Sequence, residues 1–300
     1  MKRILALLLV LMMSLSTFAC SADEQAKVMT SFYPMYIFAL NVFDGIDEIV
    51  VECMTAPQTG CLHDYQLVVS DMLKLAESDL FIVCGAGMEA YLDDVKTQFA
   101  RLPIVDCSQG IELLHDNEHA HEGHEHEDHE HVVNAHTWLD IDNAIIIVDT
   151  IAAAGIAQFP QSAEKISDNA TAYKEKLTTL KEELATTLLP VAGEKIVTFH
   201  EAFPYFARAY NLEIAAVITQ EHDEALSPAQ IAEVVKVILQ NDVPPLFTEP
   251  QYASTAAQTI ARETGAKIYE LDPIVTGDGA LSAYEDGMRK NAQTILEALK

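Results

Sequence analysis

The chain has 300 residues, 50% of them hydrophobic, and a formal net charge of −28 at pH 7. This length and composition allow two α/β domains, each with its own core, and exclude an intrinsically disordered chain. The excess of carboxylates argues against nucleic acid as a partner, because binding to phosphates requires a positive surface, and it favours the attraction of cations.

The N-terminus has the pattern of an export signal. Lys2 and Arg3 precede an unbroken apolar run, Ile4–Met13, which is too short to form a stable membrane-spanning helix. We therefore predict that residues 1–19 are a signal peptide and that the mature protein lies outside the cytoplasm.

The segment Thr17-Phe18-Ala19-Cys20 resembles a bacterial lipobox. This resemblance implies cleavage before Cys20, acylation of its thiol and a lipid anchor. Ordinary cleavage after Ala22, which would release a soluble protein, is the alternative, and mass spectrometry of the mature N-terminus distinguishes the two.

In the first half of the chain, short apolar runs alternate with helical patterns, as in a parallel sheet flanked by helices. The predicted strands are Ala26–Thr30, Glu48–Cys53, Leu80–Cys84 and Ile104–Asp106. The predicted helices are Met35–Phe43, Ser70–Leu75, Met88–Phe99 and Asn143–Phe159.

Four cysteines follow Cys20 in this half of the chain. An even number in an exported chain allows two disulfides, for which we consider the pairs Cys53–Cys61 and Cys84–Cys107. Small buried thiols are the alternative, and zinc ligation by Cys61 is a third interpretation.

Residues 115–131 hold seven histidines and seven Asp or Glu, so this His-rich loop cannot build a core. Imidazole and carboxylate are both zinc ligands, and an unperturbed imidazole is mostly neutral near pH 7. The loop therefore indicates a metal ion, above all a borderline-soft one such as Zn²⁺. A solvated charged loop is the alternative.

Apolar residues recur at helical spacing from Ile166 to Leu188, which predicts one long amphipathic helix between two α/β patterns. We interpret this helix as a rigid connector, with a crossover helix in one larger sheet as the alternative. The predicted division is an N-terminal lobe over residues 20–160, a connecting helix over 161–190 and a C-terminal lobe over 191–300.

The second half repeats the alternation of strands and helices. The predicted strands are Lys195–Thr198, Glu213–Ile218, Pro245–Thr248 and Lys267–Glu270. The predicted helices are Phe203–Ala209, Pro228–Gln240, Ala253–Thr264 and Leu281–Lys300. The fold class is therefore α/β, with two lobes that each contain a parallel sheet flanked by helices.

Outside the His-rich loop the chain has four histidines, of which three lie near predicted strand ends or helix starts. Ligands of open α/β sheets bind beyond the carboxyl ends of strands, and Asp272 also follows a predicted strand. Three imidazoles and one carboxylate suit a closed tetrahedral zinc site, so we predict His63, His136, His200 and Asp272 as metal ligands. His222, which acidic residues flank, is assigned to a solvated loop.

Other groups near the predicted site have competing interpretations. Glu249 either accepts a hydrogen bond from a ligand imidazole or stabilises a helix start, and Trp138 is expected in the core beside the site. The segment beginning at His200-Glu201 starts like the metalloprotease motif H-E-x-x-H, but Pro204 replaces the second histidine. With four protein ligands closing the metal, we predict that the protein is not an enzyme.

A set of short segments, in order along nearly the whole mature chain, makes a family resemblance specific. They are Thr30-Ser31-Phe32-Tyr33-Pro34, Leu62-His63-Asp64-Tyr65, Gly85-Ala86-Gly87-Met88-Glu89, His136-Thr137-Trp138-Leu139-Asp140, Phe199-His200-Glu201-Ala202-Phe203, Glu249-Pro250-Gln251 and Leu271-Asp272-Pro273. The chain resembles the substrate-binding lipoproteins of bacterial zinc/manganese ABC importers. The resemblance implies two α/β lobes joined by one long helix, with the metal bound in the cleft between them.

The same resemblance implies ligands at His63, His136, His200 and Asp272. In members that resemble manganese carriers the third position is usually Glu, so His200 favours Zn²⁺ over Mn²⁺, and the acidic His-rich loop is typical of the zinc branch. Two features depart from the family pattern without removing a ligand: the cysteine pair around the first ligand, and Asn134-Ala135 where Asp-Pro is common.

We therefore expect an exported, lipid-anchored monomer that captures Zn²⁺ and delivers it to an ABC permease in the membrane. A manganese or iron carrier of the same family is the nearest alternative. A zinc-dependent hydrolase and a structural surface protein without a tight metal site are more distant ones.

Overall fold

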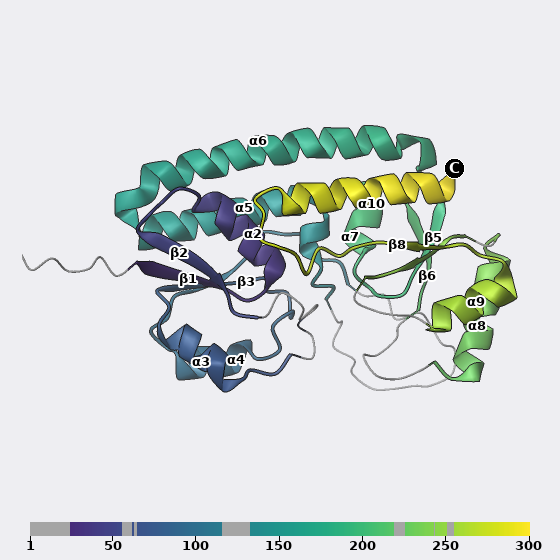
Figure 1. Cartoon of the computed structure of the whole chain (residues 1–300), viewed down its shortest axis with the longest axis horizontal. Coiled ribbons are helices and arrows are strands. Elements are labelled where there is room, and N and C mark those ends of the chain that lie inside the picture. Colours follow the sequence, from purple (N-terminus) through teal and green to yellow (C-terminus); the bar gives the residue numbers. More distant parts are fainter. Residues whose placement is uncertain are drawn as a thin grey trace, which may run out of the picture.

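The computed structural model describes residues 25–55, 62, 65–115, 133–218, 226–242, 244–250 and 255–300. Within these ranges the chain forms two four-stranded parallel sheets, one from each half of the sequence (Figure 1). A long helix, α6, runs past both sheets along one side of the molecule (Figure 1). This arrangement is the two-lobed α/β architecture that the sequence predicts.

The first sheet has the strand order β2-β1-β3-β4. Its strands are β1 Ala26–Thr30, β2 Ile49–Cys53, β3 Leu80–Val83 and β4 Ile104–Asp106. Three helices accompany them: α2 Tyr33–Val42, α3 Val69–Ala76 and α4 Leu92–Gln98. All four residues of β3, Leu-Phe-Ile-Val, are buried, as expected of a strand covered on both faces.

The second sheet repeats this order as β6-β5-β7-β8. Its strands are β5 Lys195–Thr198, β6 Glu213–Val217, β7 Leu246–Thr248 and β8 Ile268–Glu270. The accompanying helices are α7 Pro204–Ala209, α8 Pro228–Gln240 and α9 Thr255–Thr264. Because every pair in both sheets is parallel, the carboxyl ends of each sheet's strands lie at a common edge.

Two helices link the halves: α5 Ile141–Gln158 and α6 Ala163–Leu188. By length and hydropathy α5 alone, among the described residues, is apolar enough to cross a membrane, but it packs against α2 and α6. Gly155 permits this close packing, because a Cβ there would lie 2.8 Å from the ring of Phe43. Helix α6 buries the stripe that its spacing predicts, including Tyr173, Leu177 and Leu184.

The last helix, α10 Ala283–Leu299, begins beside α2 of the first half and runs along α6 (Figure 1). Near its start, the ring of Tyr284 lies 4.9 Å from that of Phe38 in α2, and its hydroxyl donates to the carbonyl of Trp138 at 2.7 Å. Asn41 of α2 donates to the carbonyl of Leu281 at 2.9 Å. The end of the chain therefore joins its two halves, and one hydrophobic core contains residues of both.

The cysteines that the structure describes are thiols. Cys84 and Cys107 are fully buried and do not form the predicted disulfide, and Cys53 is also a free thiol; Cys61 and Cys20 lie outside the described residues. The interpretation as small buried thiols is thus confirmed for Cys84 and Cys107. Burial raises the pKa of both thiols well above the ordinary value, which makes them poor nucleophiles.

We predict that Cys84 and Cys107 resist alkylation by iodoacetamide at pH 8 in the folded protein and react once it is denatured without reductant. Their thiols are fully buried, whereas Cys53, whose pKa burial also raises, is partly exposed and serves as the internal control that reacts earlier. Peptide mass spectrometry measures each site. Two cysteines that stay unmodified after denaturation, and react only after reduction, would show a disulfide instead.

Candidate metal centre

The predicted ligands of the second half lie at the carboxyl edge of the second sheet. His200 follows β5 by two residues, and Asp272 follows β8 by two residues. Glu249 directly follows β7, which pairs with both β5 and β8. The parallel register of the sheet therefore places three polar side chains from distant parts of the sequence at one edge.

His136, from the first half of the chain, meets His200 there. Their ring centroids are 4.7 Å apart and their planes are nearly perpendicular, at 87°. His136 is 2% exposed, whereas the side chain of His200 is 22% exposed. Two imidazoles at this separation can turn nitrogens toward one ion that enters from the more exposed side.

Glu249 orients the imidazole of His200. Its Oε1 lies 2.9 Å from Nδ1 of His200, and the carboxylate is buried. Since a carboxylate accepts hydrogen bonds, Nδ1 donates and Nε2 is the nitrogen that would coordinate a metal. The structure thus supports the interpretation of Glu249 as the acceptor for a ligand imidazole. The other interpretation, a helix start, stays untested, because residues 251–254 between Glu249 and helix α9 (Thr255–Thr264) lie outside the described residues.

Asn134 has the corresponding place beside His136, with 3.2 Å between its Oδ1 and Nδ1 of the ring. The indole of Trp138 packs against the same imidazole, at a centroid distance of 5.2 Å, and is fully buried as predicted. The indole Nε1 donates to the carbonyl of Pro273 at 2.8 Å, and this residue directly follows Asp272. The segments that carry His136 and Asp272 are therefore attached to each other.

The backbone of Asp272 is held by α10. Its N–H donates to Oδ1 of Asn291 at 2.9 Å, and its carbonyl accepts from Nδ2 of the same residue at 2.7 Å. The carboxylate Oδ1 accepts the backbone N–H of Ile274 at 2.8 Å. Asp272 is consequently fixed at the strand end by contacts that leave carboxylate oxygen capacity for a cation.

Not every predicted site residue can be placed. His63, Cys20, His222 and most of the His-rich loop lie outside the described residues. Within the described part of the chain, no three His, Cys, Asp or Glu side chains gather as a metal-binding cluster. The structure brings His136 and His200 together, and the set of four ligands stays a prediction.

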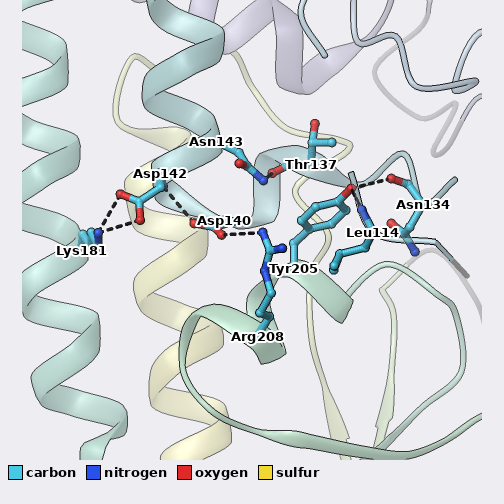
Figure 2. Close-up of polar contacts among 9 residues, drawn as sticks. All are labelled: Leu114, Asn134, Thr137, Asp140, Asp142, Asn143, Lys181, Tyr205 and Arg208. Atoms are coloured by element: carbon cyan, nitrogen blue, oxygen red, sulfur yellow. Dashed lines mark hydrogen bonds and ion pairs between the residues drawn. The ribbon is translucent and has the colours of Figure 1, made fainter. Parts of the chain in front are cut away.

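Sequence reasoning missed the residues that fix the base of the His-rich loop. His115, at its start, and Val133, two residues after its end, form an isolated antiparallel bridge. Next to them, the hydroxyl of Tyr205 in α7 accepts from the N–H of Leu114 and donates to the carbonyl of Asn134, both at 2.9 Å (Figure 2). Tyr205 lies 71 residues from Asn134, so neither spacing nor a motif indicated this contact.

A chain of polar contacts continues from this point to the long helix (Figure 2). Arg208, one turn after Tyr205, places Nη2 3.6 Å from the carboxylate of Asp140, which caps α5 by accepting from the N–H of Asp142. Burial raises the pKa of Asp140, and the guanidinium of Arg208 opposes that shift. Asp142 in turn pairs with Lys181 of α6 at 2.7 Å. The segment after His136 is therefore attached to both α6 and α7.

Comparison with known proteins identifies the family. A family model described as "Zinc-uptake complex component A periplasmic" matches residues 28–298. The chain belongs to this family. Its membership confirms the resemblance that the sequence motifs carry, and the fold agrees with it.

Individual relatives differ in the metal for which they are named. The zinc-binding lipoprotein AdcA of Streptococcus pneumoniae R6 is 29% identical, over 98% of this chain and 61% of its own length. The iron-binding protein YfeA of Yersinia pestis is 27% identical, over 91% of this chain and 86% of its own length. The solved structure of FpvC from Pseudomonas aeruginosa in complex with Mn²⁺ is 26% identical, with a TM-score of 0.79, over 92% and 98% of the two chains. The 300-residue chain described above matches only 56% to 61% of the length of the streptococcal relatives.

We predict that replacing Glu249 with Gln weakens zinc binding roughly 10-fold to 100-fold, because the amide keeps an acceptor but loses the charge that strengthens the hydrogen bond to a metal-bound imidazole. Glu285→Gln is the matched control, because Glu285 is also buried but bonds to Tyr173 in the helix layer. Competition with a chromogenic chelator measures both affinities. Equal affinities for the two variants would contradict an orienting role for Glu249.

Proposed function

We propose that this protein captures Zn²⁺ outside the cytoplasm and delivers it to an ABC permease. The observation that carries the proposal is the pair His136–His200, whose rings lie 4.7 Å apart, each with an oxygen acceptor next to Nδ1. This arrangement prepares two Nε2 atoms as ligands for one ion. Membership of a zinc-uptake family and similarity to a zinc-binding lipoprotein support it.

The proposed ligands are His63, His136, His200 and Asp272. Three nitrogens and one carboxylate suit Zn²⁺, which is borderline-soft and usually tetrahedral. Asp272 supports this assignment through its place on the edge that carries His200, and through the attachment of Pro273 to Trp138. The bound ion is the cargo, so the site binds and releases it without catalysing a reaction.

A manganese or iron carrier is the second candidate. The relative named for iron and the FpvC structure with Mn²⁺ favour it, since both are similar to nearly the whole chain. Mn²⁺ prefers oxygen ligands and higher coordination numbers, whereas imidazoles suit zinc better. The two imidazoles in contact therefore favour Zn²⁺.

The proposal extends to the parts of the chain that the structure does not describe. Residues 1–19 would be removed as a signal peptide and Cys20 acylated, which would anchor a monomer to the membrane near its permease. A relative of this chain is named a lipoprotein, which supports the anchor. Residues 20–160 and 191–300 would form the two lobes, and residues 161–190 the connecting helix.

We further propose that the His-rich loop collects zinc with low affinity and passes it to the tight site. The support is its place in the chain: its first residue, His115, bridges to Val133, which follows the loop and lies three residues before His136. Ions gathered by the loop would thus be released close to the imidazole pair.

We expect the mature protein to bind one Zn²⁺ tightly, in preference to Mn²⁺, and His200→Ala to lose that site. Competition between the two metals, followed by calorimetry, measures stoichiometry and preference. Tight binding of Mn²⁺ would move the protein to the second candidate function. Tight zinc binding that is unchanged in His200→Ala would show that the imidazole pair is not the site.

We also expect that replacing residues 115–133 with an Asn-Gly turn removes weak zinc sites and leaves the tight one. The N–H of Asn134 donates to the carbonyl of Leu114 at 2.8 Å, a bond that a two-residue turn can close. Calorimetry with excess Zn²⁺ counts both classes of site. Loss of the tight site as well would mean that the loop supplies a primary ligand.

A further inference from the structure

Asn134 uses both ends of its side-chain amide and is 2% exposed. Its Oδ1 accepts the backbone N–H of His136 at 3.0 Å and lies 3.2 Å from Nδ1 of the same residue. Its Nδ2 donates to the carbonyl of Glu201 at 2.7 Å. Glu201 directly follows His200. One amide therefore contacts both His136 and the residue next to His200.

The carbonyl of Glu201 determines which way this amide faces. A backbone carbonyl can only accept hydrogen bonds, so the atom of Asn134 that faces it must be the NH₂ group. The oxygen must then face His136. The backbone N–H of His136 donates to the same atom of Asn134, which requires that atom to be an oxygen. Because Oδ1 can only accept, Nδ1 of His136 must carry the hydrogen, which leaves the lone pair on Nε2.

The backbone of Asn134 is fixed as firmly as its side chain. Its N–H donates to the carbonyl of Leu114 at 2.8 Å, and its carbonyl accepts from the hydroxyl of fully buried Tyr205 at 2.9 Å. Tyr205 and Glu201 both belong to the second half of the chain. The amide is therefore positioned by contacts with the half that carries His200.

An aspartate, which is common at this position in the family that the chain resembles, would behave differently. Its carboxylate could still accept from Nδ1 of His136, but it has no donor for the carbonyl of Glu201. Two oxygens would face each other where the structure has a 2.7 Å hydrogen bond. Asparagine is thus the side chain that satisfies both contacts at once.

We propose that Asn134 is a positioning residue that sets the Nδ1–H tautomer of His136, and that the carbonyl of Glu201 sets the orientation of its amide. The second half of the chain thereby controls which nitrogen His136 presents. The consequence for metal binding rests on the proposed function, whereas the tautomer belongs to the metal-free protein.

Nitrogen-15 NMR of histidine-labelled, metal-free protein at pH 8, where imidazoles are neutral, tests the tautomer directly. His136→Gln identifies the signals. We expect a protonated Nδ1 and an unprotonated Nε2 in the wild type, and a mixture of tautomers in Asn134→Ala. Asn143→Ala is the matched control, because this buried asparagine donates to the carbonyl of Thr137 instead, and it should leave the His136 signals unchanged.

Asn134→Asp has nearly the same size as the wild-type residue and keeps an oxygen that can accept from Nδ1 of His136. It therefore tests the acceptor alone, and it replaces the alanine variant if that variant does not fold. It retains the acceptor and should retain the Nδ1–H signal, with a lower melting temperature from the lost Glu201 contact. An unprotonated Nδ1 in the wild type or in Asn134→Asp would overturn the inference. Unchanged His136 signals in Asn134→Ala would overturn it as well.

Zinc affinity, measured by chelator competition, gives the second readout. We expect Asn134→Ala to bind roughly 10-fold to 100-fold more weakly than wild type and Asn134→Asp to bind more tightly than Asn134→Ala. Equal weakening in both variants, with the tautomer unchanged, would show a merely structural role. Wild-type protein with the expected tautomer but no zinc binding would instead overturn the proposed function.

Discussion

Two imidazoles can bind one ion only if each turns a lone pair toward it, and a buried ring keeps that orientation while its other nitrogen has a partner. The site of this protein depends on that constraint. Glu249 supplies the acceptor for His200 and Asn134 supplies the acceptor for His136. One acceptor is a carboxylate oxygen and the other is an amide oxygen, so two different kinds of side chain orient the two rings.

The two acceptors reach the rings by different structural routes. Glu249 is adjacent to His200 because β7 pairs with β5 in the parallel sheet, an arrangement set by local register. Asn134 precedes His136 in the chain, and its amide is oriented by Glu201 and its backbone by Tyr205, which lie on the opposite half. The geometry at His136 therefore needs the whole fold, whereas much of that at His200 belongs to one sheet.

Hydrogen bonds and packing connect the two halves of the chain close to the site. Helix α10 starts against α2, continues along α6 and fixes the backbone of Asp272 through Asn291. Trp138 bonds to Pro273, and Tyr284 bonds to the carbonyl of Trp138, so the same few residues connect the segment after His136 with the last strand and the last helix. A site assembled from segments far apart in sequence thus lies within one continuous core.

Local patterns in the sequence determined the secondary structure and therefore the fold class. Every described strand and α-helix overlaps its predicted range, because apolar runs and helical spacing depend on neighbouring residues. Residue chemistry and strand ends also selected His136, His200 and Asp272, and a histidine's need for an acceptor suggested Glu249. The sequence did not reveal the roles of Asn134, Tyr205 and Arg208, or the thiol state of Cys84 and Cys107. Their contacts join residues tens of positions apart through hydrogen bonds and burial, and only the packing of the two halves decides those.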